Sequence, residues 1–581
     1  MAPDELPFLT EGVDAEIFGT GLPVCRDKDV RPRMARHMNR MAGRFKAIGT
    51  WELLIRMAVV AVLLHCCCGI SAYAGDFPQT VRIDTGVLSG TPGTNSAVTV
   101  FRGIPYAAPP VGNLRWKPPV RATKWSGVRK VDYFAPSCMQ PNWKGQAARF
   151  ETSEDCLYIN VWTPARKPSE KRPVMVWIYG GGFNVGSSSD PEFDGEGLAA
   201  KGVVRVSFNY RLGLFGFMTH PDLDKESPHH VSGNYGLLDQ IAALEWVSRN
   251  IAAFGGDPTH VTIFGQSAGG GSVQFLSLSP LAKGLFHRAI CENGILYYDD
   301  PYLQERSPVA FKTLKKAESD VIDYLQKAGV DLSKLRSMSA AEILALPKPP
   351  FPPAFFTPTI DGWVLPTDFA ETYAHGTQSD VPFMAGWTSV YYPRIKISVG
   401  EYHNWAEARF GSLAGEYLSL YPASTDEEAG LVLEVSTRDS YRTSLYLWAQ
   451  ARQKKFKTFI YYYNHGAPGS GVEQFGARAG AEIPYVMNSL SKLDRPYVKN
   501  DYAVAEMMSS YWANFAKSGD PNGDGLPIWP SVTAGAKVAM QLGDNDGVIP
   551  VASEAKFNFF KRFFATHPHC PWGEPCSINV Q

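Results

Sequence analysis

Short apolar runs alternate with segments of helical periodicity along most of this chain. One helix-period segment covers residues 237–254 and separates two of the apolar runs. Continuous apolar runs of this length are typical of strands buried on both faces, and intervening helices link such strands in parallel. The alternation therefore predicts a mainly parallel sheet covered by helices, with functional loops at the carboxyl ends of the strands. The runs lie at 173–180, 203–210, 260–265, 381–386 and 458–464.

The segment Met57–Ala74 has the pattern of a secretory signal peptide. A short apolar core follows Arg56, and the segment ends in the small-x-small sequence Ala-Tyr-Ala. The alternative is a membrane anchor, but His65 and Gly69 interrupt the apolar run, and a span needs about 20 apolar residues. The sequence favours export, to the periplasm or the exterior, and no stable membrane span in the mature chain.

The rest of the chain consists of a leading segment and one long segment after the signal peptide. Residues 1–56 contain no usable motif and represent a leader of unknown role or a misassigned start, whereas residues 75–581 show no linker, repeat or long charge run. We expect residues 75–581 to form a single domain. A formal net charge of −1 and 45% hydrophobic residues give no indication of a nucleic-acid partner. The sequence does not indicate an oligomeric state.

Nine cysteines are present, and three of them, Cys66–Cys68, belong to the signal segment. In an exported protein the others are more often disulfide-bonded than metal-bound. Cys138 with Cys156 is the best candidate pair, and Cys570 with Cys576 is the next. No Cys/His group has the spacing of a zinc site, and no dinucleotide or P-loop motif occurs, so the sequence implies neither a metal nor a cofactor.

The segment Gly265–Gly269 reads Gly-Gln-Ser-Ala-Gly, directly after an apolar run and before a probable helix. This G-x-S-x-G pattern is typical of a nucleophile elbow, a tight strand-to-helix turn that holds a serine hydroxyl above a sheet. A chance glycine-rich turn is the alternative. The strand before the motif and the helix after it favour Ser267 as a nucleophile.

A run of three glycines ends the apolar segment at residues 177–183. Consecutive glycines let backbone N–H groups approach a ligand closely, so Gly181 and Gly182, with the N–H of Ala268, form a candidate oxyanion hole. The alternative is an ordinary glycine loop. The order of this loop and the elbow along the chain favours the oxyanion hole.

Residues 75–530 resemble the type-B carboxylesterases, the family that includes acetylcholinesterase and bacterial p-nitrobenzyl esterases. The resemblance implies an α/β-hydrolase fold, with a mostly parallel central sheet flanked by helices, and hydrolysis of a small-molecule ester through a Ser267 acyl-enzyme. It also implies that Gly181, Gly182 and Ala268 form the oxyanion hole and that Cys138 pairs with Cys156. The matching segments are 101–116, 153–164, 177–183, 233–258, 265–269, 481–486 and 511–530.

The other two positions of the family's catalytic triad are altered. Tyr391, between Val390 and Tyr392, stands where the family has its acid, and Ala479 stands where it has its histidine. A serine hydroxyl is a weak nucleophile without an adjacent base, and the same base activates water for deacylation. In subtilisin the removal of the histidine lowers kcat by about 2 × 10⁶. We therefore expect weak or altered activity unless another group replaces the base.

His465 is the best substitute base, because it directly follows the apolar run at 458–464 and so lies at the carboxyl end of a predicted strand. His229 and His230, in the loop before the segment at 233–258, are second. A solvated or helix-capping role is the alternative for each of these three histidines.

Three functions are consistent with these residues. The first is a secreted carboxylic ester hydrolase. The second is a non-hydrolytic enzyme that uses the oxyanion hole to polarise another carbonyl substrate. The third is a catalytically impaired binding protein of the same fold, and it predicts ligand binding or a single acylation without turnover.

Overall fold

The computed structural model describes most of the chain after residue 78. Residues 75–581 form one compact unit. The leader and signal predictions for residues 1–74 lie outside the described residues, and so does the predicted pair Cys570–Cys576. The described ranges are 79–141, 150–295, 297–300, 312–349, 355–389, 396–452, 455–469 and 476–566.

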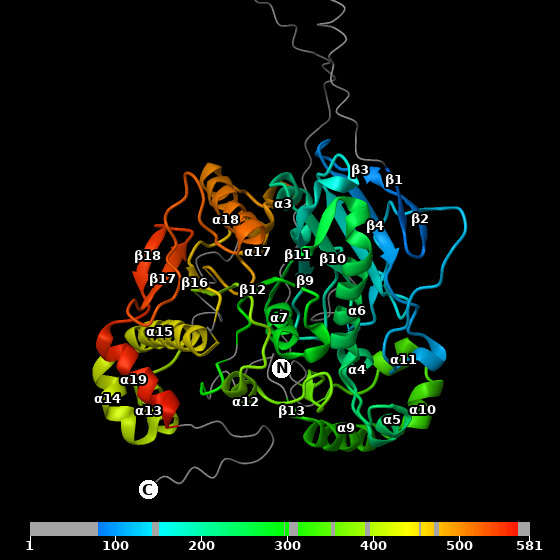
Figure 1. The fold of residues 1–581 in the computed structure, drawn as a ribbon. Coiled ribbons are helices and arrows are strands. Elements are labelled where there is room, and N and C mark those ends of the chain that lie inside the picture. Colours follow the sequence, from blue (N-terminus) through cyan, green and yellow to red (C-terminus); the bar gives the residue numbers. More distant parts are fainter. Residues whose placement is uncertain are drawn as a thin grey trace, which may run out of the picture. The chain divides into compact units, whose positions relative to one another are not determined.

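An 11-stranded sheet forms the centre of this unit, with β3 and β4 at one edge and β17 and β18 at the other (Figure 1). All pairings from β10 through β17 are parallel, and the pairings outside this block are antiparallel. The order is β18(Gly547–Pro550), β17(Val538–Leu542), β16(Thr458–Tyr463), β15(Phe383–Thr388), β12(Arg288–Glu292), β11(Gly256–Gln266), β9(Arg172–Ile178), β10(Val204–Phe208), β8(Tyr158–Thr163), β4(Thr99–Pro105) and β3(Thr91–Pro92).

The five apolar runs correspond to β9, β10, β11, β15 and β16, so the predicted mostly parallel sheet is confirmed. β10, β15 and β16 are buried along their whole length. Apolar side chains pack the strands against one another and against their neighbours. For example, the Trp177 ring on β9 lies 4.9 Å from the Phe264 ring on β11 and 5.3 Å from the Phe193 ring. Each buried side chain of this size contributes about 1.5–3 kcal/mol.

Helices flank the sheet. Helix α6 covers most of the predicted segment 237–254, whose last four residues form a 3₁₀ turn. Helices α3 and α18 contact each other and the central strands, and so do α6 and α7. The helices are α3(Glu196–Ala200), α4(Gly213–Phe217), α5(Pro221–Glu226), α6(Tyr235–Asn250), α7(Ala268–Leu278), α9(Leu314–Ala328), α10(Leu332–Ser337), α11(Ala340–Leu344), α12(Phe369–His375), α13(Val399–Phe410), α14(Ala414–Leu420), α15(Asp426–Arg452), α17(Ile483–Met487), α18(Lys499–Ser518) and α19(Glu554–Ala565).

Small sheets and turns complete the unit. One three-stranded sheet contains β1(Thr80–Ile83), β2(Gly86–Ser89) and β5(Val128–Lys130). Two further pairs are β6(Ser137–Cys138) with β7(Thr152–Ser153), and β13(Lys312–Thr313) with β14(Thr359–Ile360). Among the described helices, none combines the length and apolar character needed to cross a membrane.

One disulfide and one buried ion pair connect segments around the sheet. Cys138 on β6 forms a disulfide with Cys156, the pair predicted from the sequence, and closing a loop of this size stabilises the fold by about 3 kcal/mol. Arg211, just after β10, forms a buried ion pair with Asp239 on α6. Its Nη2 donates to Asp239 Oδ1 at 2.7 Å, and its Nε donates to Oδ2 at 2.8 Å. This pair ties α6 to the sheet.

Candidate active site

Ser267 lies at a tight turn between the end of β11 and the start of α7. Its backbone has φ 55° and ψ −124°, a conformation that a serine adopts only where its surroundings impose it. The flanking glycines make the turn possible: a Cβ at Gly269 would lie 1.9 Å from the carbonyl oxygen of Ile178. This is the strand, turn and helix that a nucleophile elbow requires.

Backbone hydrogen bonds hold the turn in place. The N–H of Ser267 donates to the carbonyl oxygen of Glu292 at 2.8 Å, and the N–H of Gly271 donates to the carbonyl oxygen of Ser267 at 2.8 Å. The Ser267 residue is half-buried, and its Oγ makes no hydrogen bond with any residue that the structure describes. Within the described chain, therefore, no base is placed on the serine hydroxyl.

The glycine loop after β9 packs directly on this turn. A Cβ at Gly180 would lie 2.5 Å from the carbonyl oxygen of Gln266 and 3.0 Å from Ser267 Cβ. Gly181 has φ 105°, and a side chain there would meet the carbonyl oxygen of Val185 at 2.0 Å, so only glycine fits. Among the described residues, nothing accepts a hydrogen bond from the N–H groups of Gly181, Gly182 and Ala268. Such N–H groups are available to an anionic oxygen.

The segment that contains Ala479, the predicted equivalent of the family's histidine, lies beside the elbow. Ala479 is half-buried, and a Cβ at the next residue, Gly480, would lie 3.8 Å from Gln266 Nε2. Arg478 is exposed. Because Gln266 precedes Ser267 directly, Ala479 stands close to the elbow, where its methyl group cannot accept a proton.

The segment in which the resemblance places the family's acid follows the end of β15 in the sequence. Thr388 is its last strand residue, and the N–H of Ser389 donates to the carbonyl oxygen of Tyr463 at 2.7 Å. Tyr391, with Val390 and Tyr392, lies outside the described residues. β15 is parallel to β12, and β12 is parallel to β11, so all three strands end at the same edge of the sheet.

Two buried carboxyl groups lie behind the elbow, and the sequence analysis missed both. Glu292 ends β12, and its Oε1 accepts a hydrogen bond from Trp512 Nε1 at 2.8 Å. Glu482 precedes α17, and its Oε1 accepts one from Asn293 Nδ2. Burial and the neighbouring Glu482 raise the pKa of Glu292 well above its ordinary value. The available signal was a glutamate inside each of two otherwise apolar segments.

The structure gives His465 partners other than Ser267. Its Nε2 lies 2.9 Å from Asp501 Oδ1 and its Nδ1 lies 2.8 Å from Asp544 Oδ1. Burial lowers the pKa of His465, but the hydrogen bonds to the two aspartates outweigh burial and raise it. In this arrangement neither ring nitrogen is free to take a proton from Ser267. A substitute-base role for His465 stays a prediction, and this geometry argues against it.

We expect His465→Gln to lower the free energy of unfolding by about 1–2 kcal/mol in mildly acidic solution, after allowance for solvent screening. The raised pKa of His465 makes its contribution fully present below the unfolded value of about 6.5, and the contribution is lost as pH rises through the folded value. The lowered pKa of Asp501 removes the contribution again in acid, below about pH 4. Urea unfolding between pH 4 and 9 measures the difference.

The control for this experiment is His229→Gln, because His229 is exposed. A destabilisation by His465→Gln that is equal at every pH would contradict the ionic role of His465.

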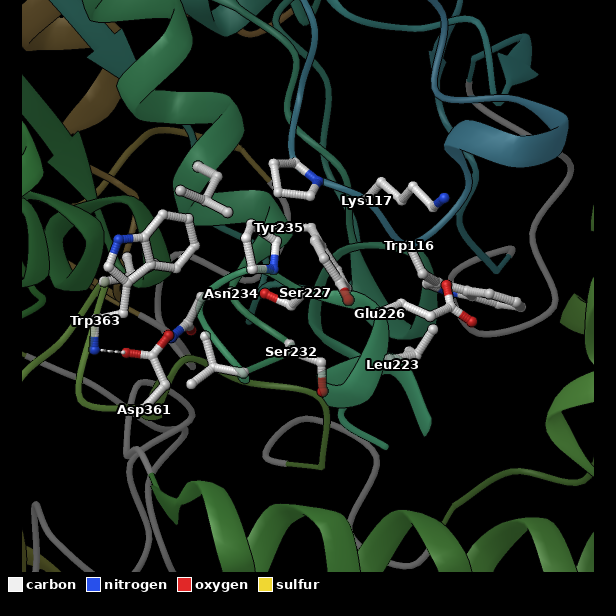
Figure 2. A pocket seen from close by; sticks show the side chains of 16 residues that line it. Trp116, Lys117, Leu223, Glu226, Ser227, Ser232, Asn234, Tyr235, Asp361 and Trp363 are labelled. Atoms are coloured by element: carbon white, nitrogen blue, oxygen red, sulfur yellow. Dashed lines mark hydrogen bonds between the residues drawn. The ribbon is translucent and has the colours of Figure 1, made fainter. Parts of the chain in front are cut away.

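His229 and His230 lie in the loop between α5 and α6, and both are exposed. The His229 ring stacks on Trp363, with 3.8 Å between ring centroids. Trp363 lines a pocket of about 120 Å³ at the start of α6. Figure 2 shows Trp363 and Asp361 on one side of this pocket and Trp116 and Glu226 on the other. None of the elbow residues lines it.

Comparisons with known proteins identify the family. The profile of the Carboxylesterase family matches residues 78–393 and 400–560. The fumonisin B1 esterase of Sphingopyxis macrogoltabida is 36% identical over 499 residues, which cover 81% of this chain and 89% of that protein. Carboxylesterase 1F of Mus musculus is 34% identical over 484 residues, 75% of this chain and 85% of that protein.

Liver carboxylesterase 1 of Oryctolagus cuniculus is 34% identical over 488 residues, 75% of this chain and 84% of that protein. The chain belongs to the carboxylesterase family of α/β-hydrolases. The resemblance and the fold class that its sequence indicated are confirmed, and a family of this kind implies small-molecule ester substrates.

Proposed function

We propose that the protein is a slow serine hydrolase of small carboxylic esters. Ser267 is the nucleophile, and the N–H groups of Gly181, Gly182 and Ala268 bind the oxyanion. The observation that carries the proposal is the strained backbone of Ser267, φ 55°, beside the N–H groups of Gly181, Gly182 and Ala268, which have no acceptor among the described residues. Strain of this kind persists at functional sites, where the surrounding structure maintains it.

The chemistry follows from these groups. Ser267 Oγ attacks the ester carbonyl, the oxyanion forms against the N–H groups, and the alcohol leaves to give an acyl-enzyme. Ala479 and Tyr391 hold the positions of the family's histidine and acid, so both acylation and attack by water lack the usual base. Turnover is therefore slow, because acylation and deacylation both proceed without that base.

A second candidate is a protein that is acylated once, or binds its ligand, without turnover. It is favoured because no described side chain forms a hydrogen bond with Ser267 Oγ. A related candidate is an enzyme that uses the oxyanion hole on another carbonyl compound without hydrolysis.

We also propose that the working protein is the exported domain of residues 75–581. The disulfide between Cys138 and Cys156 supports this, because such bonds persist in oxidising compartments outside the cytosol. The fumonisin B1 esterase relative suggests fumonisin B1 as a substrate to test beside simple esters.

The experiment is steady-state hydrolysis of p-nitrophenyl butyrate by the wild type and by Ser267→Ala. We expect the wild type to exceed the variant at least tenfold, which corresponds to about 1.4 kcal/mol of barrier. Circular dichroism confirms that the variant is folded. Equal rates would overturn the hydrolase proposal, and intact-mass measurement would then separate single acylation from simple binding.

A further inference from the structure

Four buried oxygen atoms behind the elbow have no hydrogen-bond partner among the residues that the structure describes. Two are the Oε2 atoms of Glu292 and Glu482, and two are the hydroxyls of Tyr461 and Tyr463 on β16. All four side chains belong to residues that are fully buried. Buried polar groups without a protein partner are ordinarily satisfied by ordered water, and each such water needs two to four polar neighbours.

These four groups lie near one another. Glu292 on β12 and Tyr461 on β16 are both in register with Gly386 of the intervening strand β15, and Tyr463 follows Tyr461 on the same face of β16. Asn293, next to Glu292, donates a hydrogen bond to Glu482 Oε1. We call these four side chains the polar cluster. Four buried polar atoms without protein partners among the described residues are a site that ordered water would satisfy.

The polar cluster adjoins Ser267 through the backbone. The carbonyl oxygen of Glu292 accepts the hydrogen bond from the Ser267 N–H at 2.8 Å. Glu482 follows Ala479 by three residues, and the intervening Gly480 lies beside Gln266. The cluster is thus next to the elbow and next to the position that the family's histidine occupies.

Asn293 links Glu482 to the strand that leads to the altered acid position. Its Nδ2 donates to Glu482 Oε1, and its Oδ1 accepts hydrogen bonds from Thr388 N at 2.8 Å and Thr388 Oγ1 at 3.1 Å. Thr388 precedes Tyr391 by three residues. Asn293 therefore connects the Glu482 carboxyl group to Thr388, the last residue of β15.

We propose that Glu482 receives the proton of Ser267, through water held by the polar cluster, in place of the missing histidine. This inference rests on the proposed ester hydrolysis at Ser267. It assigns the proton to a residue that follows the vacant histidine position rather than to His465.

The proton is accounted for in both acylation and deacylation. The Ser267 O–H bond breaks as Oγ bonds to the carbonyl carbon, the proton passes through water to Glu482 Oε2, and the carbonyl electrons move to the oxyanion. The carbonyl then re-forms as the bond to the alcohol breaks, and the alcohol oxygen takes the proton from Glu482. In deacylation water bonds to the acyl carbon and gives a proton to Glu482. The bond between the acyl carbon and Ser267 Oγ then breaks, and Oγ takes that proton from Glu482 to restore the hydroxyl as the acid leaves.

The electrostatic surroundings suit Glu482 to this exchange. Burial raises the pKa of Glu482 to about 7, against the lowering effect of backbone contacts and of the hydrogen bond from Asn293. A group with a pKa near the working pH is an efficient general base. The titratable groups that face Glu482 are Glu292 on β12, Tyr461 and Tyr463 on β16, and Glu192.

The test compares the wild type with Glu482→Gln as full chains. Glutamine keeps the side-chain volume and can still accept the hydrogen bond from Asn293, but it cannot take a proton. We expect kcat/KM for p-nitrophenyl butyrate to fall at least tenfold, and we expect the rise of the wild-type rate near pH 7 to disappear. Glu506→Gln, which removes an exposed carboxylate on α18, is the matched control and leaves both readouts unchanged.

The outcomes separate this inference from the proposed function. Ser267-dependent hydrolysis whose rate and pH profile survive Glu482→Gln overturns the role of Glu482 and leaves the hydrolase intact. A wild-type rate equal to that of Ser267→Ala overturns both. If Glu482→Gln does not fold, Glu482→Asp decides: a shifted apparent pKa supports the inference, and an unchanged pH profile overturns it.

Discussion

Replacing Ala479 by histidine is expected to raise kcat/KM for p-nitrophenyl butyrate by about 10²-fold. Ala479 stands beside the elbow, next to Gly480 and close to Gln266, so an imidazole there returns a base to the neighbourhood of Ser267 Oγ. A positioned general base typically contributes 10²–10⁴-fold, and we expect the lower figure because the resemblance places Tyr391, not a carboxylate, at the acid position. Stopped-flow and steady-state kinetics of the purified variant measure the gain.

The control is Arg478→His, because position 478 is exposed and an imidazole there gains no access to the serine. The gain must also vanish when Ser267→Ala is added to Ala479→His. A variant that folds and shows no gain would mean that position 479 is not the site of the missing base, and the account of the slow reaction would fail with it.

Replacing Arg211 by methionine is expected to lower the free energy of unfolding by about 3–5 kcal/mol. The side chains of Arg211 and Asp239 are 4% and 0% exposed, and the guanidinium donates two hydrogen bonds to the carboxylate. Without Arg211 the Asp239 carboxylate stays buried with no opposite charge. Urea unfolding followed by circular dichroism gives the difference.

Arg336→Met provides the comparison, because Arg336 forms an ion pair with Glu226 at 2.7 Å in which both side chains are more than a third exposed. Exposed pairs contribute about 0–1 kcal/mol. Similar losses for the two variants would show that the burial of the Arg211–Asp239 pair is not the source of its contribution.

The fold could be predicted because its strands are continuous in sequence. One apolar run marks each of the five strands β9, β10, β11, β15 and β16. Strands buried on both faces, in a sheet between two layers of helices, are apolar along their length, so the runs predict this kind of sheet. The antiparallel strands β4, β8 and β18 gave no such signal. β18 is an edge strand and alternates between half-buried and exposed residues, whereas β4 and β8 are largely buried but contain polar residues such as Arg102 and Asn160.

The candidate site could be predicted only where a local motif fixes the backbone. The Ser267 turn and the glycine loop each need glycine at fixed positions, which a sequence shows directly. The partners of His465 could not be predicted, because Asp501 and Asp544 are distant in sequence and meet it only after α18 and the β17–β18 turn are packed. The polar cluster could not be predicted either, because its residues on β12, on β16 and before α17 are distant in sequence and meet only in the folded protein.

We expect Ser267 to act as a nucleophile although Ala479 stands where the resemblance places the family's histidine. Intact-protein mass spectrometry after mixing with p-nitrophenyl acetate, followed by peptide mapping, measures this. One acetyl group should appear on the peptide that contains Ser267, decay slowly as the acyl-enzyme hydrolyses, and be absent from Ser267→Ala. An unlabelled Ser267 peptide, or a label that persists in Ser267→Ala, would show that Ser267 is not the nucleophile.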